Sequence, residues 1–246
     1  MKEWRQIQTV LSAIYPPRCL ACGEMVEDNF GLCGPCWGDT AFIGGTACDQ
    51  CGTPLPGDAA PDETVTCDEC QKSEHPWDKG RAAFIYGGTG RKLVLSLKHG
   101  DRQDIAHPAA RWLAMAGKDL LLDKSTLIAP VPLHWIRLLK RRYNQSAVLA
   151  QALSRQSGID WCPDLLIRQR RTPSLDGKSK EDRRETVKGA FAMHQKRKHR
   201  IVGRGVLLID DVMTTGATLA ATAQTCLDAG ADHVNVLCLA RVAKDA

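Results

Sequence analysis

The sequence predicts an α/β protein with a mostly parallel sheet, preceded by a cysteine-rich zinc module. Eight of the 11 cysteines form four C-x-x-C pairs within residues 19–70. From residue 81 onward, short apolar runs alternate with amphipathic stretches and short connections, which is the pattern of strand–helix–strand units. A chain of 246 residues has room for a small module beside a medium domain. We therefore expect two domains, residues 1–79 and residues 80–246.

The N-terminal stretch predicts a short amphipathic helix rather than a signal peptide. In residues 4–14 apolar side chains recur at helical spacing, and polar side chains interrupt them. No apolar run reaches the length of a membrane span. We therefore expect a cytoplasmic protein with reduced thiols, in which Cys162, Cys226 and Cys238 are buried as small apolar side chains.

The four C-x-x-C pairs predict two structural zinc ions, because two such turns supply four thiolates to one tetrahedral Zn(II). The first unit, C-L-A-C-G…C-G-P-C, is echoed by C-D-Q-C-G…C-D-E-C, which favours sequential sites and leaves an interleaved arrangement open. Disulfides, a redox pair and an iron–sulfur cluster fit the sequence less well, and His75 is expected at the surface. We therefore expect a double zinc ribbon. The expected ligands are Cys19, Cys22, Cys33 and Cys36 for one ion, then Cys48, Cys51, Cys67 and Cys70 for the other.

Charge is segregated along the chain. Between Cys19 and Asp78 there are twelve Asp and Glu against one Lys, whereas between Val131 and Arg204 there are eighteen Lys and Arg against six acids. An acidic module repels phosphate backbones, so we expect it to stabilise the fold or to dock a protein partner. An anionic ligand is expected in the basic half, away from the zinc module.

The second part of the chain predicts alternating strands and helices. The strands are short apolar runs, and three of the four helices end at a glycine. A polar, basic segment at 169–188 contains Pro173 and Gly177 and predicts a mobile loop. The expected strands are 82–86, 127–132, 164–168, 189–193, 205–210 and 233–242, and the expected helices are 91–100, 105–122, 134–158 and 219–230.

The segment G-V-L-L-I-D-D-V-M-T-T-G-A-T-L at 205–219 carries the strongest functional signal. An apolar strand ends at two carboxylates, and a tight Thr- and Gly-containing loop leads straight into a helix, whose free N-terminal amides attract anions. The carboxylates suit a diol or Mg(II), so the loop predicts a ribose 5-phosphate site. Two acids in a row argue against simple helix capping, and a Walker lysine and a G-x-G-x-x-G are both missing. The expected binding residues are Asp210, Asp211, Val212, Met213, Thr214, Thr215, Gly216, Ala217 and Thr218.

This segment resembles the ribose-phosphate motif of type I phosphoribosyltransferases, and most of the chain resembles the ComF family of competence proteins, which is related to amidophosphoribosyltransferases. The resemblance rests on the cysteine-rich start, L-K-H-G at 97–100, P-V-P-L-H-W-I-R-L-L-K-R-R-Y-N-Q-S at 130–146 and R-R-T-P-S…R-R-E-T-V-K-G-A-F at 170–191. It implies a type I phosphoribosyltransferase-like fold that binds 5-phosphoribosyl-1-pyrophosphate (PRPP) with Mg(II).

The resemblance also implies roles for two further loops. Residues 132–137 would hold pyrophosphate, and the 169–188 loop would close over the site. The arginines considered there are Arg170, Arg171, Arg183 and Arg184, of which Arg171 and Arg184 are the expected catalytic residues; Lys98, His134 and Arg142 are expected to contact the ligand. Leu175 stands where the family has glutamine, and Glu185 and Thr186 replace Arg-Asn, so binding is better supported than turnover.

Two functions follow. One is a phosphoribosyltransferase with a nitrogen acceptor that the sequence does not name. The other is a non-catalytic accessory factor in DNA uptake, which uses the pocket for binding and the basic stretch 137–204 for single-stranded DNA.

Overall fold

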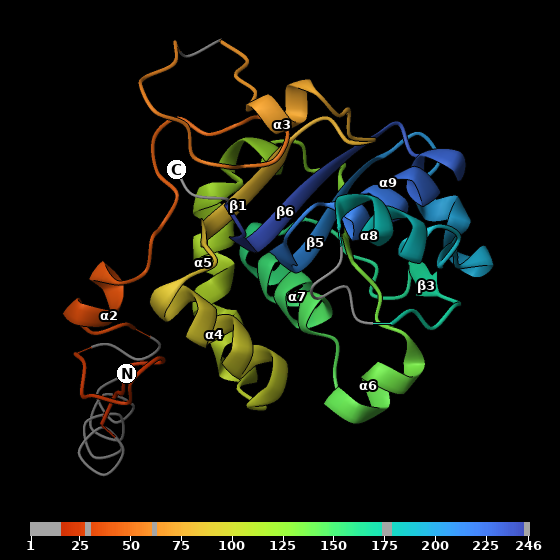
Figure 1. Ribbon diagram of the computed structural model, residues 1–246. Helices are drawn as coiled ribbons and strands as arrows, with labels where there is room; N and C mark the ends of the chain where they lie inside the picture. The colour runs from red at the N-terminus through yellow and green to blue at the C-terminus, as the bar shows by residue number, and fades with distance from the viewer. Residues whose placement is uncertain (1–15, 28–30, 61–62, 174–178, 244–246) are drawn as a thin grey trace.

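A four-stranded parallel sheet organises the molecule in the computed structural model, which describes residues 16–27, 31–60, 63–173 and 179–243. The strand order is β1-β6-β5-β2, and every neighbouring pair is parallel (Figure 1). The carboxyl ends of the strands therefore lie at one edge. The predicted parallel α/β class is confirmed. The strands are β1 (Gly80–Ile85), β2 (Leu127–Pro130), β5 (Gly205–Met213) and β6 (His233–Arg241).

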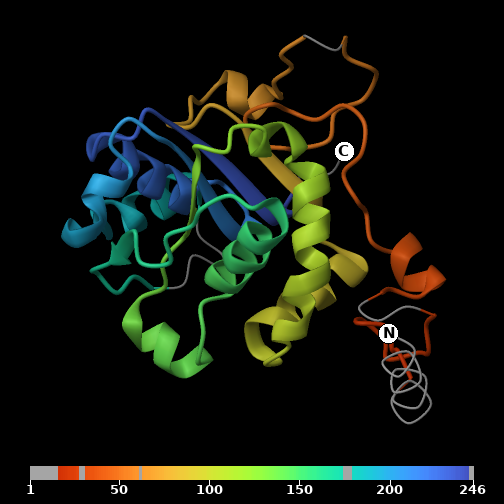
Figure 2. The ribbon, with the colours of Figure 1, turned by 180° about the vertical axis from the view of Figure 1, so that it is seen from behind.

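Three helices cover one face of the sheet, as Figure 2 shows from behind. They are α4 (Gly88–His99), α5 (Ala106–Ala116) and α7 (Gln145–Ser157). Leu207 and Ile209 of β5 point into this layer, where they meet side chains such as Leu113 and Leu149. Among the described helices, none combines the length and apolar character that crossing a bilayer requires.

The opposite face is covered by α9 (Ala217–Asp228) together with the second half of the cysteine-rich segment. Val206 and Leu208, which alternate with the residues of the first face, pack here against Cys226 and the zinc-ribbon cysteines Cys48 and Cys51. A zinc ribbon thus covers part of the sheet where α/β proteins place a helix. The proposed boundary between residues 79 and 80 stays a prediction.

The expected helix over 134–158 is wrong as a single element. It divides into α6 (Trp135–Arg141) and α7, with Arg142 in the left-handed conformation at φ 68°. Asn144 caps α7 by accepting a hydrogen bond from the Ser146 amide, and its Nδ2 donates to the Val131 carbonyl at 2.9 Å. The cap begins a new helix and anchors its first turn to the end of β2.

Two further expectations need correction. The segment expected as a loop at 169–188 contains α8 (Lys180–Val187), which Ser179 caps. The expected strands near 166 and 191 do form, as β3 (Leu166–Arg168) and β4 (Phe191–Met193), but they pair antiparallel in a separate two-stranded sheet. Residues 174–178 and the expected N-terminal helix at 4–14 lie outside the described residues.

Cys162, Cys226 and Cys238 are fully buried, which confirms their predicted place in the core.

Candidate ligand site and zinc ribbons

The eight paired cysteines form two tetrads, and the predicted sequential pairing is confirmed. Within each tetrad all Sγ atoms lie within 4.8 Å of one another. Zinc–sulfur bonds of ~2.3 Å in a tetrahedron place sulfurs about 3.8 Å apart. Cys22 and Cys33 have their Sγ atoms at 3.5 Å, and Cys51 and Cys67 at 3.7 Å. Both tetrads therefore fit a structural zinc ion, whose four thiolates leave no open coordination position.

The two ribbons differ in their surroundings. The first, around α2 (Gly34–Gly38), is peripheral (Figure 1) and has an exposed Cys22. It reaches the rest of the molecule through Asp39, whose carboxylate accepts the Thr89 amide at 2.8 Å at the start of α4. The second, around α3 (Asp68–Gln71), buries Cys48, Cys51 and Cys70 against the sheet. The second ribbon thus buries three of its cysteines against the sheet, whereas the first contacts the helix layer through the buried Leu20.

Asp210 and Asp211 lie near the carboxyl end of β5, where the sequence predicted them. Asp210 is partly buried, and its Oδ1 accepts hydrogen bonds from Ser146 Oγ at 2.8 Å and from the Asp211 amide at 2.9 Å. Asp211 is buried, and its Oδ1 pairs with Lys98 Nζ at 3.0 Å. Each carboxylate therefore has its own partner, one from α7 and one from α4.

This environment shifts the protonation of Asp210. Burial raises its pKa to about 7, and repulsion by the neighbouring Asp211 adds to the shift, while the Ser146 hydrogen bond opposes it. At neutral pH Asp210 is therefore close to the midpoint of its titration. An added cation, or hydroxyl donors from a ligand, would favour the doubly ionised form.

The loop that follows the acids turns at Gly216, which has φ 74° and stands immediately before α9. The first turn of α9 presents amides that have no partner within the helix. Thr215 Oγ1 is a buried hydroxyl with no hydrogen-bond partner among the described residues. Buried Arg241 of β6 donates to the Met213 and Thr214 carbonyls and so holds the start of the loop. Donors thus gather at the loop, which suits an anion.

The predicted basic residues lie in different places. Lys98 reaches the acidic pair. His134 is buried and caps α6, accepting the Ile136 amide at 3.3 Å. Arg142 is 81% exposed and lies 3.7 Å from Asp101 rather than against the acids.

The two predicted catalytic arginines do not contact the loop in this structure. Arg171 is exposed. Arg184 of α8 donates to Ser73 Oγ in the second ribbon, and the neighbouring Arg183 instead donates to Thr214 Oγ1 at 2.8 Å. The roles given to Arg171 and Arg184 stay predictions.

Sequence reasoning missed three contacts at the site. Ser146 was part of the N-Q-S motif, but its bond to Asp210 depends on the separate start of α7. The sequence signal for Arg241 is a charged residue at the end of an otherwise apolar strand. The expectation that the zinc module lies away from the ligand loop is wrong, because the Trp77 ring packs directly against Gly216.

These features define a protein with two zinc-ribbon cysteine tetrads beside a parallel α/β domain. Residues 10–75 match the family model described as double zinc ribbon domain. Over 231 residues the chain is 32% identical to DNA utilization protein YhgH of Escherichia coli O157:H7, covering 92% of this chain and 97% of that one. It is also 32% identical to competence protein F of Haemophilus influenzae, covering 91% and 96%. The chain belongs to the ComF family of competence proteins.

Solved structures show a partial likeness. TT1426 from Thermus thermophilus superposes with a TM-score of 0.35 and 16% identity, over 57% of this chain and 85% of that one. Hypoxanthine-guanine phosphoribosyltransferase from L. donovani gives 0.32 and 12%, over 61% and 71%.

Proposed function

We propose that the protein binds PRPP with Mg(II) at the loop of residues 210–218. The proposal rests on one observation: hydrogen-bond acceptors and hydrogen-bond donors lie close together at this loop. Asp210 and Asp211 offer acceptors for a vicinal diol, and the α9 N-terminus with the unpartnered Thr215 hydroxyl offers donors for a phosphate. A phosphorylated ribose carries both groups.

As an enzyme, the protein would transfer the phosphoribosyl group to a nitrogen acceptor. The bond between C1 of the ribose and the pyrophosphate oxygen breaks, a C1–N bond forms, and the nitrogen loses a proton. Mg(II) would stabilise the charge on the leaving pyrophosphate. Asp210 and Asp211 would hold the ribose hydroxyls and fix the position of C1. Arg171 and Arg184 would contact the pyrophosphate.

Isothermal titration calorimetry of the zinc-loaded protein with PRPP and Mg(II) tests binding. The wild type should bind, and the double variant Asp210→Asn and Asp211→Asn should not. A matched control is Asp160→Asn, because Asp160 pairs with Arg200 and Arg204 at the opposite end of β5. The control should bind as the wild type does, and no heat of binding from the wild type would refute the proposal.

Transfer is tested separately by following pyrophosphate release with a panel of nitrogenous bases and amines. Release that depends on an acceptor and disappears in Arg184→Ala would support an enzyme. Binding with no release for any acceptor would leave the protein a PRPP-binding factor.

The second function is an accessory role in DNA uptake, which the names of the relatives favour. The structural observation in its support is α6, a basic helix at the surface with Trp135 61% exposed. Exposed aromatic rings beside cations suit single-stranded nucleic acid. Fluorescence anisotropy with labelled single-stranded DNA should show salt-dependent binding that Arg141→Glu weakens, and undiminished binding by that variant would contradict the role of α6.

We also propose a cytoplasmic location, in keeping with reduced zinc thiolates, and a protein partner for the acidic first ribbon. Crosslinking in cells followed by peptide mapping should recover crosslinks on residues 16–27 or 31–42. Their absence from these ranges would contradict the partner.

A further inference from the structure

Trp77 is fixed by the second zinc ribbon. It is 3% exposed, and its Nε1 donates a hydrogen bond to the Gln50 carbonyl at 2.6 Å. Gln50 lies between Cys48 and Cys51, inside the tight turn that supplies two of the four sulfurs. The position of the indole ring is therefore coupled to the geometry of the second zinc site.

The other side of the same ring supports the ligand loop. A Cβ atom added to Gly216 would lie 2.9 Å from Cη2 of Trp77 and 3.7 Å from Cε1 of His75. The two rings are stacked, with centroids 4.2 Å apart and planes 12° apart. Gly216 has φ 74°, a left-handed conformation that glycine adopts readily, and the nearby Trp77 ring leaves no room for a side chain there. The turning residue of the loop rests on an aromatic pair from the ribbon.

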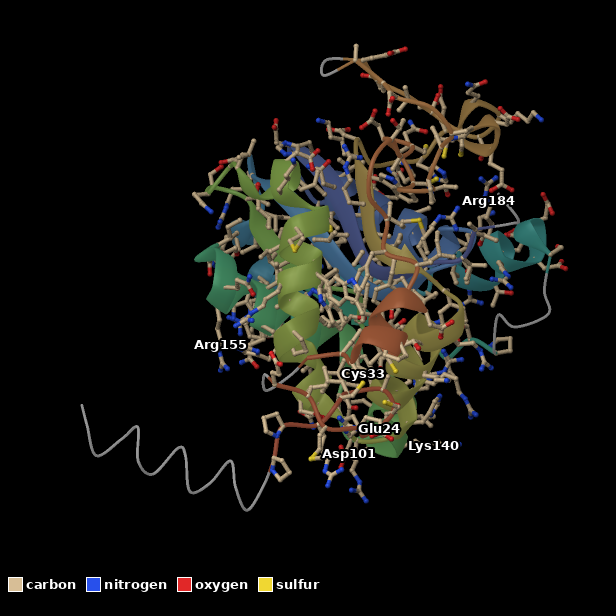
Figure 3. All side chains as sticks on the ribbon, turned by 90° about the vertical axis from the view of Figure 1, so that its left-hand side faces the viewer. Glu24, Cys33, Asp101, Lys140, Arg155 and Arg184 are labelled. Atoms are coloured by element: carbon tan, nitrogen blue, oxygen red, sulfur yellow. The ribbon has the colours of Figure 1, made fainter. Side chains whose placement is uncertain are left out.

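A second contact joins the second ribbon to α8. Ser73 Oγ accepts from Arg184 of α8, which Figure 3 labels between α8 and the second ribbon. Residues of the ribbon, α8, the loop and α9 together line a pocket of about 800 Å³, among them His75, Thr215 and Gly216. The ribbon is thus one wall of the region beside the loop.

The first ribbon has no comparable contact among the described residues. Its ties run to α4, α5 and β1, through Asp39 with Thr89 and through the edge-to-face contacts of Phe42 with Phe84 and Trp112.

We propose that the second zinc ion, acting through Trp77, holds residues 214–218 in their anion-binding shape, and that the first zinc ion does not. Trp77 is a positioning residue. It contacts the loop, and the amides and hydroxyls of the loop would contact the ligand. The consequence for PRPP rests on the proposed function, whereas the effect on the loop itself is independent of any ligand.

Hydrogen–deuterium exchange of the zinc-loaded, ligand-free protein tests the loop directly. In Trp77→Ala, amides of residues 214–219 should exchange roughly tenfold faster than in the wild type, because a packed neighbour that limits local opening is lost. The variant Trp77→Phe keeps a ring beside Gly216 but lacks the Nε1 donor to Gln50, so its loop exchange should fall between those of Trp77→Ala and the wild type. The matched control is Trp37→Ala, because Trp37 belongs to the first ribbon and is 52% exposed.

Zinc content is measured on every variant, so that a loop effect is separated from loss of metal. Faster loop exchange with two zinc ions still bound supports a direct role of the ring. Faster exchange with loss of the second zinc, with loop exchange and zinc content both intermediate in Trp77→Phe, supports the same coupling. Unchanged loop exchange in Trp77→Ala overturns it.

Calorimetry with PRPP and Mg(II) then separates the two proposals. Affinity should fall roughly tenfold in Trp77→Ala, in parallel with the exchange rate, and stay unchanged in Trp37→Ala. If the wild type binds no PRPP but the loop still loosens in Trp77→Ala, the proposed function fails and the coupling stands. If Trp77→Ala binds as tightly as the wild type with normal loop exchange, the coupling alone fails.

Discussion

Replacing Asp210 by Asn should stabilise the folded protein while abolishing ligand binding. Ser146 Oγ and the Asp211 amide both donate to the Oδ1 atom of Asp210, and an amide oxygen can accept the same two bonds. What the substitution removes is the charge. Burial and the neighbouring Asp211 make that charge unfavourable in the folded state, which is why the pKa of Asp210 is raised to about 7.

The magnitude follows from linkage. An acid with a folded-state pKa above its unfolded value is protonated in the native protein and ionised in the unfolded chain between the two pKa values. The unfolded chain then binds fewer protons, so stability falls as pH rises from about 4 to about 7. With an ordinary pKa of 3.8 in the unfolded chain and a folded-state pKa of about 7, the penalty is ~3 kcal/mol at pH 6 and ~4 kcal/mol at pH 8, as an upper limit.

Urea unfolding of the zinc-loaded wild type and Asp210→Asn at pH 6 and pH 8 measures the difference. The free energy of unfolding of the variant should exceed that of the wild type at both values, with about 1 kcal/mol more at pH 8. The pH dependence of zinc binding affects both proteins equally and cancels. Asp211→Asn is the contrasting control, because it relieves the same repulsion but leaves Lys98 without its partner, so its gain in stability should be smaller than that of Asp210→Asn. A destabilised Asp210→Asn, or a gain that grows toward pH 6, would refute the reasoning.

Further predictions concern the loop, the helix break and the metals. Gly216→Ala places a methyl group 2.9 Å from Trp77 at φ 74° and should lower the free energy of unfolding, measured in urea, by about 1–3 kcal/mol. Arg142→Gly removes the strain of a non-glycine residue in the left-handed conformation and also loses one exposed ion pair. The free energy of unfolding should rise by about 1 kcal/mol. Ser146→Ala removes a hydrogen bond that lowers the pKa of Asp210, so the midpoint of the pH dependence of PRPP binding, measured by calorimetry, should move to higher pH. Competition with a coloured chelator should release two zinc ions per chain, the peripheral ribbon losing its ion first, and a single simultaneous release would contradict the difference between the ribbons.

Features set by neighbouring residues were predictable from sequence. The tetrads were predicted with their pairing, because each depends on two local turns and a repeat. The loop after β5 was predicted as well, since an apolar run followed by Asp210 and Asp211 and a helix start is a continuous signal. Arg142, in contrast, sits within an uninterrupted helical pattern. Its left-handed conformation follows from Asn144 anchoring to Val131, and that contact belongs to the tertiary structure.

The remaining errors have the same origin. The apolar runs of β3 and β4 predict strands, but the residues around them do not determine whether the two strands pair with each other or with the main sheet. The contact of Trp77 with Gly216 joins segments far apart in the chain and opposite in charge. Charge segregation suggested separation of the two, yet apolar packing brought them together, because an aromatic ring and a glycine do not respond to net charge.

The position of the second ribbon has a consequence for how the chain is made. Its end is tied to β6, the last strand: the Asp78 amide donates to the Val234 carbonyl, and the Lys79 amide donates to Asn235, 156 residues later. During synthesis the cysteines leave the ribosome early and can capture zinc at once, but the surface they must cover does not exist until β6 has been translated. We therefore expect a nascent chain whose second ribbon is loaded but undocked until β6 has left the ribosome and completed the sheet face.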